Sequence, residues 1–292
     1  MILFNNKILS PSQNDIVFLW ILRLLALITG MIVILITSFL LLEALPLLQQ
    51  VGWLRFVRDQ AWHPVQGLYN LMPMLWGTLL VTLGSVLLAT PLGIGSALFC
   101  QYYAPPFIGK GYRALIELLA GIPSVVYGFW GLVVLVPLIG KWQPPGTSLL
   151  AGIIILTLMI LPTIALTAEA SFAEVPTEYV QGAAALGLSH WATIRGVIIP
   201  AAQSGLVTGL ILATGRAIGE TMAVLMVCGN VVQTPKSLFD PVRTLTANIA
   251  LEMAYALGNH RSALFVTGLL LMMLITLLIG IAEGMSWSKD YG

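Results

Sequence analysis

An arginine and a glutamate stand four residues apart inside one of the most apolar parts of the chain. Arg216 and Glu220 belong to the run GRAIGETMAVLMVCGN, residues 215–230. A charged side chain at the centre of a membrane helix costs at least about 2.5–3.5 kcal/mol on insertion scales. Four residues apart on a helix, the two side chains would share one face and could neutralise each other. The pair is therefore the first candidate for a functional site.

Two interpretations of this pair are open. In one, it is a structural ion pair that allows the helix to exist in lipid. In the other, the helix lines a path for an anion, Arg216 meets the solute and Glu220 holds Arg216 in place. The planar guanidinium suits a tetrahedral oxyanion because it donates two parallel hydrogen bonds. The second interpretation is favoured, since two leucines would cost less than a self-neutralised pair.

A proline interrupts another apolar stretch, AGIPSVVYGFWGL, residues 120–132. Pro123 removes one backbone hydrogen bond of the helix, and Ser124 with the nearby glycines leaves room around the interruption. In a broken helix the free N–H groups could face an anion, which makes Ser124 a candidate path residue. A simple proline kink is the favoured interpretation.

Glycines recur along the stretch that carries the charged pair, at Gly205, Gly209, Gly215 and Gly219. Small residues at this spacing allow membrane helices to approach each other closely. We therefore expect tight helix packing here, with Arg216 at a helix–helix seam rather than in lipid.

The interval at residues 174–200, EVPTEYVQGAAALGLSHWATIRGVIIP, predicts two short helices joined by a turn. Pro176 suits the first turn of a helix, and Glu178 favours its positive N-terminus. Gly187 can take the left-handed conformation that ends a helix, and Ser189 can cap the next one. A DNA-reading helix-turn-helix is excluded, because the interval has one basic residue, Arg195, and lies between two apolar stretches.

These candidate residues belong to a chain whose composition indicates an integral membrane protein. Of its 292 residues, 58% are hydrophobic and 9% are charged, against about 25% charged in ordinary globular domains. A bilayer core of about 30 Å needs about 20 apolar residues in a helix. The stretches that qualify are residues 16–45, 74–102, 114–139, 149–168, 201–227 and 263–282. Because these runs are continuous rather than alternating, they predict an all-α integral membrane fold with six transmembrane helices.

The sequence contains no constellation typical of an enzyme. His63, His190 and His260 are isolated from each other, and Cys100 and Cys228 fall in different apolar stretches. These positions give neither a metal-ligand spacing nor a disulfide framework. The P-loop sequence G-x-x-x-x-G-K-[ST] does not occur, so we expect any ATP to be used by a partner. We expect this chain to bind no cofactor and no metal, and to be no enzyme.

Residues 181–200 resemble the coupling loop of the permeases of binding-protein-dependent ABC importers. The family pattern is Glu-Ala-Ala, three residues, Gly, nine residues, Ile, one residue, Leu-Pro. The matching positions are Gln181, Gly182, Ala183, Gly187, Val197, Ile199 and Pro200. Gln181 replaces the Glu and Gly182 replaces an Ala, which affects any salt bridge of that Glu but not the shape of the loop. The resemblance implies a cytoplasmic loop that docks into a cleft on a separate ATPase subunit.

Longer segments from residue 62 onward resemble the phosphate permease subunits of this family. They are WHPVQGLYNLMPMLWGTLLVT, IELLAGIPSVVYGFWGLVVLVP, GRAIGETMAVLMVCGN and LFDPVRTLTANIA. The run Met-Ala-Val-Leu-Met after Gly-Glu-Thr is similar to the PstC type rather than to its PstA sister. The resemblance implies a MetI-like permease fold, phosphate transport into the cytoplasm across the cell inner membrane, and a role for Arg216 and Glu220 in phosphate passage.

The same resemblance implies an assembly. The expected partners are a second permease subunit (PstA-like), two copies of an ATPase (PstB-like) that uses ATP and Mg²⁺, and a periplasmic phosphate-binding protein (PstS-like). No nucleic acid is expected as a partner. A cytoplasmic coupling loop places both termini inside, whereas the basic residues on the two sides do not decide the orientation.

The expected organisation has three parts. Residues 1–73 hold a cytoplasmic segment, the first transmembrane helix and a periplasmic loop; residues 74–284 form the permease core, with the coupling loop at 171–200; and residues 285–292 form a cytoplasmic tail. Two alternative functions are kept. One is a permease for another tetrahedral oxyanion, such as molybdate or sulfate, and the less favoured one is an ion-coupled secondary transporter acting alone.

Overall fold

Long apolar helices dominate the structure. This computed structural model describes residues 13–290, and the side chains of residues 16–280. Within that part, four helices are long and apolar enough to cross a membrane singly. They are α1 (Gln13–Val51), α3 (Met72–Leu98), α7 (Leu149–Ala173) and α14 (Asn259–Asp290). Most of the expected cytoplasmic start of the chain, residues 1–12, and the end of the expected tail, residues 291–292, lie outside the described residues.

Two further candidate spans are bent pairs of helices. The first pair bends by 94° and the second by 69°. The first consists of α4 (Pro106–Gly121) and then α5 (Ser124–Trp130), η3 (Gly131–Leu135) and α6 (Val136–Gly140). The second consists of α9 (His190–Thr193), η4 (Ile194–Ile198) and α10 (Ile199–Ala201), followed by α11 (Gln203–Gly219). The expected six spans are obtained when each bent pair counts as one, and at Pro123 the structure has a break rather than a simple kink.

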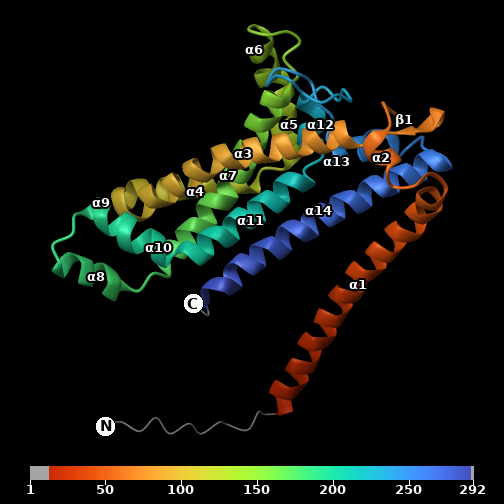
Figure 1. Cartoon of the computed structure of the whole chain (residues 1–292). Coiled ribbons are helices and arrows are strands. Elements are labelled where there is room, and N and C mark those ends of the chain that lie inside the picture. Colours follow the sequence, from red (N-terminus) through yellow and green to blue (C-terminus); the bar gives the residue numbers. More distant parts are fainter. Residues whose placement is uncertain (1–12, 291–292) are drawn as a thin grey trace.

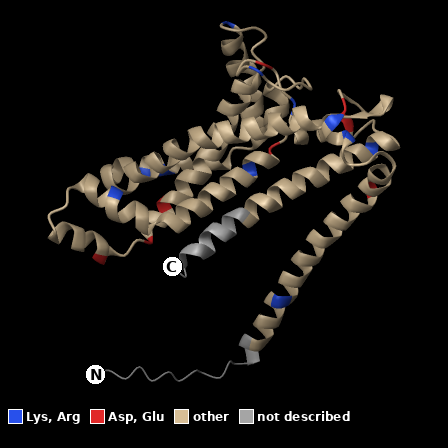
Figure 2. Ribbon diagram, viewed as in Figure 1, with Lys and Arg blue, Asp and Glu red and all other residues tan. Residues whose placement is uncertain are grey.

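Shorter elements complete the structure. They are α2 (Arg55–Arg58), β1 (Trp62–His63), η1 (Pro64–Gln66), β2 (Leu68–Tyr69), η2 (Phe99–Tyr103), α8 (Thr177–Ala185), α12 (Met222–Val227) and α13 (Leu245–Glu252). The two strands pair antiparallel, with Trp62 opposite Tyr69. Elements α8 and α9 lie at one end of the bundle, and α2 and β1 lie at the opposite end (Figure 1). Most charged residues lie toward these ends, whereas the helices between them carry few (Figure 2).

Helix α7 forms the centre of the bundle because it is apolar on nearly every face. Its buried residues pack against α3 on one side and α11 on another. Glycines allow this close approach: a Cβ on Gly84 of α3 would lie 2.6 Å from Ile153 Cδ1. On α11, Gly205 and Gly209 lie directly against hydroxyl side chains of α7. The predicted glycine packing is thus confirmed for the first half of α11.

The second half of α11 differs from the expectation. A Cβ added to Gly215 or to Gly219 would meet no atom within 4 Å outside its own helix in the described chain. The expected close packing through these two glycines therefore does not form within the described chain. Arg216 is exposed, although Ala213 and Ala217 beside it are buried, so it stands at the edge of the contact between α11 and α7. This part of α11 instead borders open space on the surface of the subunit.

Helix α1 stands apart from the bundle over most of its length. None of the residues in its most apolar window is buried. Its C-terminal half packs on α14, where Ala44 and Leu47 are fully buried and the rings of Phe39 and Phe265 meet edge to face at 5.6 Å. Figure 1 shows that the N-terminal half of α1 diverges from the other helices. Apart from Arg23, that half thus presents mostly apolar side chains all round, as expected for a helix in lipid or against another membrane chain.

A buried carboxylate ties together the end of the bundle that carries β1. Glu252, at the end of α13, is 8% exposed. Its carboxylate accepts a hydrogen bond from Trp62 Nε1 at 2.9 Å and one from Arg243 Nη1 at 2.7 Å. His260 Nε2 lies 2.8 Å from the same carboxylate. Trp62 therefore meets three side chains of residues 243–260, about 180 to 200 residues later in the chain, an arrangement that the sequence analysis did not predict.

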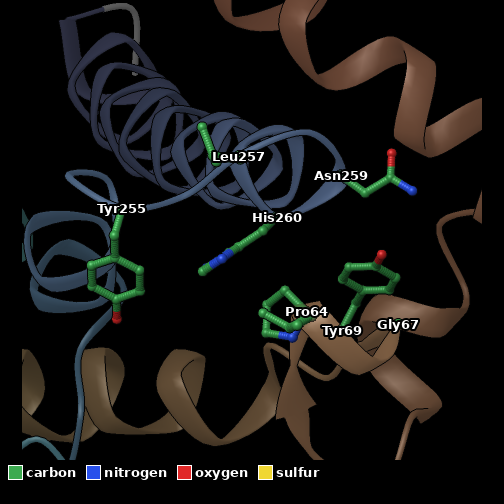
Figure 3. Close-up of a pocket in the computed structure, with 8 residues that line it drawn as sticks. Pro64, Gly67, Tyr69, Tyr255, Leu257, Asn259 and His260 are labelled. Carbon is green, nitrogen blue, oxygen red and sulfur yellow. The ribbon is translucent and has the colours of Figure 1, made fainter.

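A cavity of about 520 Å³ lies beside this carboxylate cluster and opens to the surface. Figure 3 shows the ring of His260 between Tyr255 and Pro64, with Tyr69 and Asn259 at the other side of the cavity. Because the Nε2 atom of His260 contacts the Glu252 carboxylate, this histidine supports the structure of the end of the bundle that carries β1.

We predict that Glu252→Leu destabilises the protein strongly. The substitution leaves the mostly buried guanidinium of Arg243 without its 2.7 Å partner, and breaking a buried ion pair in this way costs about 3–5 kcal/mol. The thermal unfolding midpoint of the purified protein in detergent should fall clearly. As a control, Glu117→Gln breaks an exposed pair with Arg113 and should cost less than about 1 kcal/mol. Equal midpoints for the two variants would contradict the prediction.

Candidate substrate path and coupling loop

Helix α11 ends at Gly219, directly before Glu220. The backbone of Glu220 is extended, with φ −68° and ψ 130°. Its carboxylate accepts a hydrogen bond from the N–H of Ala223 at 3.1 Å, and its backbone carbonyl accepts one from the Thr246 hydroxyl at 2.8 Å. The expected continuous helix over 201–227 is therefore wrong: the chain breaks at Glu220 and resumes as α12. Glu220 caps that second helix and fastens the break to α13.

The expected ion pair between Arg216 and Glu220 does not form. Because the helix ends between them, the two residues no longer share a regular helical face. Within the described part of the chain, no carboxylate lies within 4.0 Å of the Arg216 guanidinium. Arg216 Nη1 instead donates a hydrogen bond to Thr163 Oγ1 of α7 at 3.2 Å. Thr163, which the sequence analysis did not select, holds Arg216 in the way that was expected of Glu220.

The two helix breaks lie at the same level in the bundle. A Cβ on Gly128 of α5 would lie 2.8 Å from Ala223 Cα of α12, and one on Gly131 would lie 2.8 Å from Val227 Cγ1. The contacts advance together along both helices, so α5 and α12 run parallel. In this register the half-buried Ser124, four residues before Gly128, lies at about the level of Glu220, three residues before Ala223.

The break between α4 and α5 is closed by a tyrosine. Pro123 has no N–H to give to the carbonyl of Leu119, four residues earlier. The hydroxyl of Tyr127 donates to that carbonyl at 2.9 Å. A cavity of about 340 Å³ lies at this elbow against α7, lined by Leu119, Ile122, Val126, Tyr127, Trp130, Leu158 and Leu161. Its walls carry no charge, so Arg216, which lies outside this lining, is the group suited to an anion.

Residues 174–200 fold as two short helices joined by a turn, as the sequence predicts. Helix α8 ends in a Schellman motif: the N–H of Leu188 bonds to the carbonyl of Ala183 at 3.1 Å, and the N–H of Gly187 bonds to that of Ala184 at 3.0 Å. Gly187 has φ +72°, the left-handed conformation that this motif requires. The Ser189 hydroxyl then caps α9 by accepting from the Ala192 N–H.

The other predicted loop residues differ in burial. Gln181 and Gly182 are exposed on α8, Ala183 is buried beneath it, and Pro200 is exposed in α10. Large apolar side chains also stand on the surface of α8 and α9 or at the turn between them: Tyr179, Leu186, Leu188 and Trp191. An exposed apolar group of this kind, rimmed by polar residues, is typical of a protein-binding surface.

Aromatic contacts anchor the loop to the bundle. Buried Ile194 and Ile198 of η4 belong to one core cluster with Phe172 of α7. Tyr102 of η2 packs edge to face on Phe172, with ring centroids 6.2 Å apart, and also contacts His190 of α9. Movement of α8 and α9 is thereby linked directly to α3 and α7.

The fold, the two broken helices and the loop define the class of protein: an integral membrane permease of the ABC importer type. Residues 89–285 match the family described as "Binding-protein-dependent transport system inner membrane component", and the chain belongs to that family. A Bacillus subtilis relative, "Probable ABC transporter permease protein YqgH", is 42% identical over 252 residues, covering 84% of this chain and 82% of that one. "Phosphate transport system permease protein PstC" of Mesorhizobium japonicum is 35% identical over 257 residues, covering 80% and 79%.

Solved structures confirm the predicted MetI-like permease fold. A chain of a bacterial alginate ABC transporter is similar with a TM-score of 0.65 and 15% identity, covering 95% of this chain and 97% of that one. A chain of the MetNI methionine ABC transporter is similar with a TM-score of 0.61 and 21% identity, covering 75% and 95%. At these identities the likeness concerns the fold alone.

We predict that Arg216 and Glu220 are energetically independent. In a double-mutant cycle of Arg216→Gln and Glu220→Gln, followed by thermal unfolding in detergent, the coupling free energy should stay below about 0.5 kcal/mol. The matched positive control is the cycle of Arg243→Gln with Glu252→Gln, two side chains that do pair at 2.7 Å. Coupling of Arg216 to Glu220 as large as in that control would show that the two side chains pair after all.

Proposed function

We propose that this chain is the transmembrane permease subunit of an ATP-driven importer that moves inorganic phosphate into the cytoplasm. The observation that carries the proposal is the exposure and the hydrogen bonding of the Arg216 side chain. Its guanidinium is exposed near a break in an apolar bundle, with one contact to Thr163 and donors left over for a solute. Ionisable groups at such depth mark solute paths, and a guanidinium binds oxyanions in bidentate fashion.

The choice of phosphate has a separate support. One arginine with neighbouring hydroxyls suits any tetrahedral oxyanion, including molybdate and sulfate. Relatives that cover most of this chain are named as phosphate transport permeases, among them those of Mesorhizobium japonicum and Haemophilus influenzae. On this ground phosphate is the proposed solute, with Arg216, Glu220 and Ser124 lining its path.

A second permease subunit follows from the exposure of Arg216. A path needs walls on all sides, whereas Gly215 and Gly219 border open space in this chain. A PstA-like partner would supply the missing wall and cover the second half of α11. The proposed outer partner is a PstS-like phosphate-binding protein of the periplasm.

The energy source is proposed to be a PstB-like ATPase that uses ATP and Mg²⁺ on the cytoplasmic side. Its docking surface would be the exposed apolar tip of α8 and α9, with Gln181, Gly182 and Gly187 in the loop that it moves. This orientation places the start of α1 and the end of α14, and hence both termini, in the cytoplasm. ATPase movement would reach the path through the contacts of Tyr102 and Phe172.

We predict that Arg216→Gln lowers ATP-dependent phosphate uptake at least about tenfold, equal to ~1.4 kcal/mol. The reason is the loss of the charge that offsets the phosphate in an apolar path. Uptake of radiolabelled phosphate measures the effect, and copurification of the partner subunits tests assembly, which should be intact. Arg113→Gln, outside the path, is the control. Unchanged uptake would refute the path role, and suppression of uptake by excess molybdate or sulfate would redirect the choice of solute.

We predict that Gly187→Val abolishes phosphate uptake while the chain still inserts in the membrane. Gly187 has φ +72°, and a side chain in this left-handed region costs about 1–2 kcal/mol, more when it is β-branched. The turn should therefore shift, and the ATPase should no longer copurify. Gly111→Ala, at an exposed position of α4 outside the loop where an added Cβ meets nothing within 4 Å, is the control and should leave uptake normal. Normal uptake by Gly187→Val would contradict the coupling role of the loop.

A further inference from the structure

Threonine hydroxyls on α7 differ in how they use their proton. Thr157 donates to the carbonyl of Ile153 at 2.7 Å, and Thr167 donates to the carbonyl of Thr163 at 2.8 Å. Both hydroxyls are therefore satisfied by their own helix. In the described part of the chain, the Thr163 hydroxyl has no acceptor within hydrogen-bond distance to which it could donate its proton. Its oxygen accepts from Arg216 Nη1 instead.

This difference leaves a free donor beside the arginine. A threonine hydroxyl has one O–H donor and two acceptor lone pairs. The guanidinium of Arg216 occupies one lone pair, so the proton of Thr163 is available to a third group. A hydroxyl that accepts from a cation is also polarised, which strengthens its own donation.

The position of Thr163 is fixed by the bundle. Its neighbours Pro162 and Ile164 are buried, and Ile164 lies against Gly93 of α3, where a Cβ would come within 2.8 Å. Thr163 itself is partly exposed, and the Arg216 side chain that it holds is exposed. The hydroxyl thus stands on a rigid wall and opens to the same side as the guanidinium.

We propose that Thr163 is a specificity-determining residue that positions the Arg216 guanidinium and donates its O–H to an oxygen of the passing anion. The inference rests on the proposed path role of Arg216. The ligand class is a tetrahedral oxyanion with at least two acceptor oxygens on one side: one binds the guanidinium and the next binds the hydroxyl. A halide presents a single centre and gains less from this arrangement.

The test uses the complete importer in proteoliposomes, with ATP inside and radiolabelled phosphate outside. Thr163→Val keeps the shape of the side chain and removes the hydroxyl; it should lower phosphate uptake about tenfold, ~1.4 kcal/mol. Thr163→Ser keeps the hydroxyl and should restore most of the uptake. Thr167→Val, one turn further along α7, removes a hydroxyl that serves only its own helix and should transport normally.

Three outcomes would overturn the inference. Normal uptake by Thr163→Val, together with lost uptake in Arg216→Gln, would rule out the proposed role of Thr163 without contradicting the proposed function. Normal uptake by both variants would dismiss the proposed function as well. A thermal unfolding midpoint that falls in both Thr163→Val and Thr163→Ser, with uptake lost in both, would assign Thr163 a structural role only.

Discussion

The interior of a lipid bilayer offers no hydrogen-bond partner to the backbone groups that are left unpaired where a helix breaks. In this chain, side chains form hydrogen bonds with backbone groups at each break. At the first break the Leu119 carbonyl accepts from the Ile122 N–H at 3.3 Å and, more closely, from the Tyr127 hydroxyl at 2.9 Å. At the second, Thr246 takes the Glu220 carbonyl, and the Glu220 carboxylate takes the Ala223 N–H. Both breaks are consequently rigid. An arginine one turn before the second break is therefore held at a defined depth.

Helix α7 connects this region to the loop at the other end. It carries Thr163 beside the arginine and, more than two turns later, the fully buried Phe172. Phe172 packs with Tyr102 and with Ile198 of the segment that follows the loop. Because α7 is buried on most faces and closely packed, it is suited to move as one body. A displacement of the loop would thus reach the surroundings of the Arg216 guanidinium through α7 alone.

The sequence predicted those features of the structure that depend on interactions between residues close together in the chain. The turn at Gly187 and the cap at Ser189 depend on residues within five positions of each other, and both are present. The end of α11 was missed because Glu220 and Thr221 are compatible with a helix, and the hydroxyl that fastens the break comes from Thr246, 26 residues later. Likewise, nothing in the sequence pairs Trp62 with Glu252 across 190 residues. The role of Thr163 was equally hidden, since its partner lies 53 residues away.

The carboxylate of Glu252 has a consequence for the biosynthesis of the chain. Its partners include Trp62, translated early, and His260, which opens the last helix. The ribosome has to complete nearly the whole polypeptide before these groups can meet. Until then the nascent chain carries the Trp62 indole N–H without the acceptor that Glu252 provides. A copy that terminates before Glu252 keeps that defect permanently, so the end of the bundle that carries β1 cannot complete its structure.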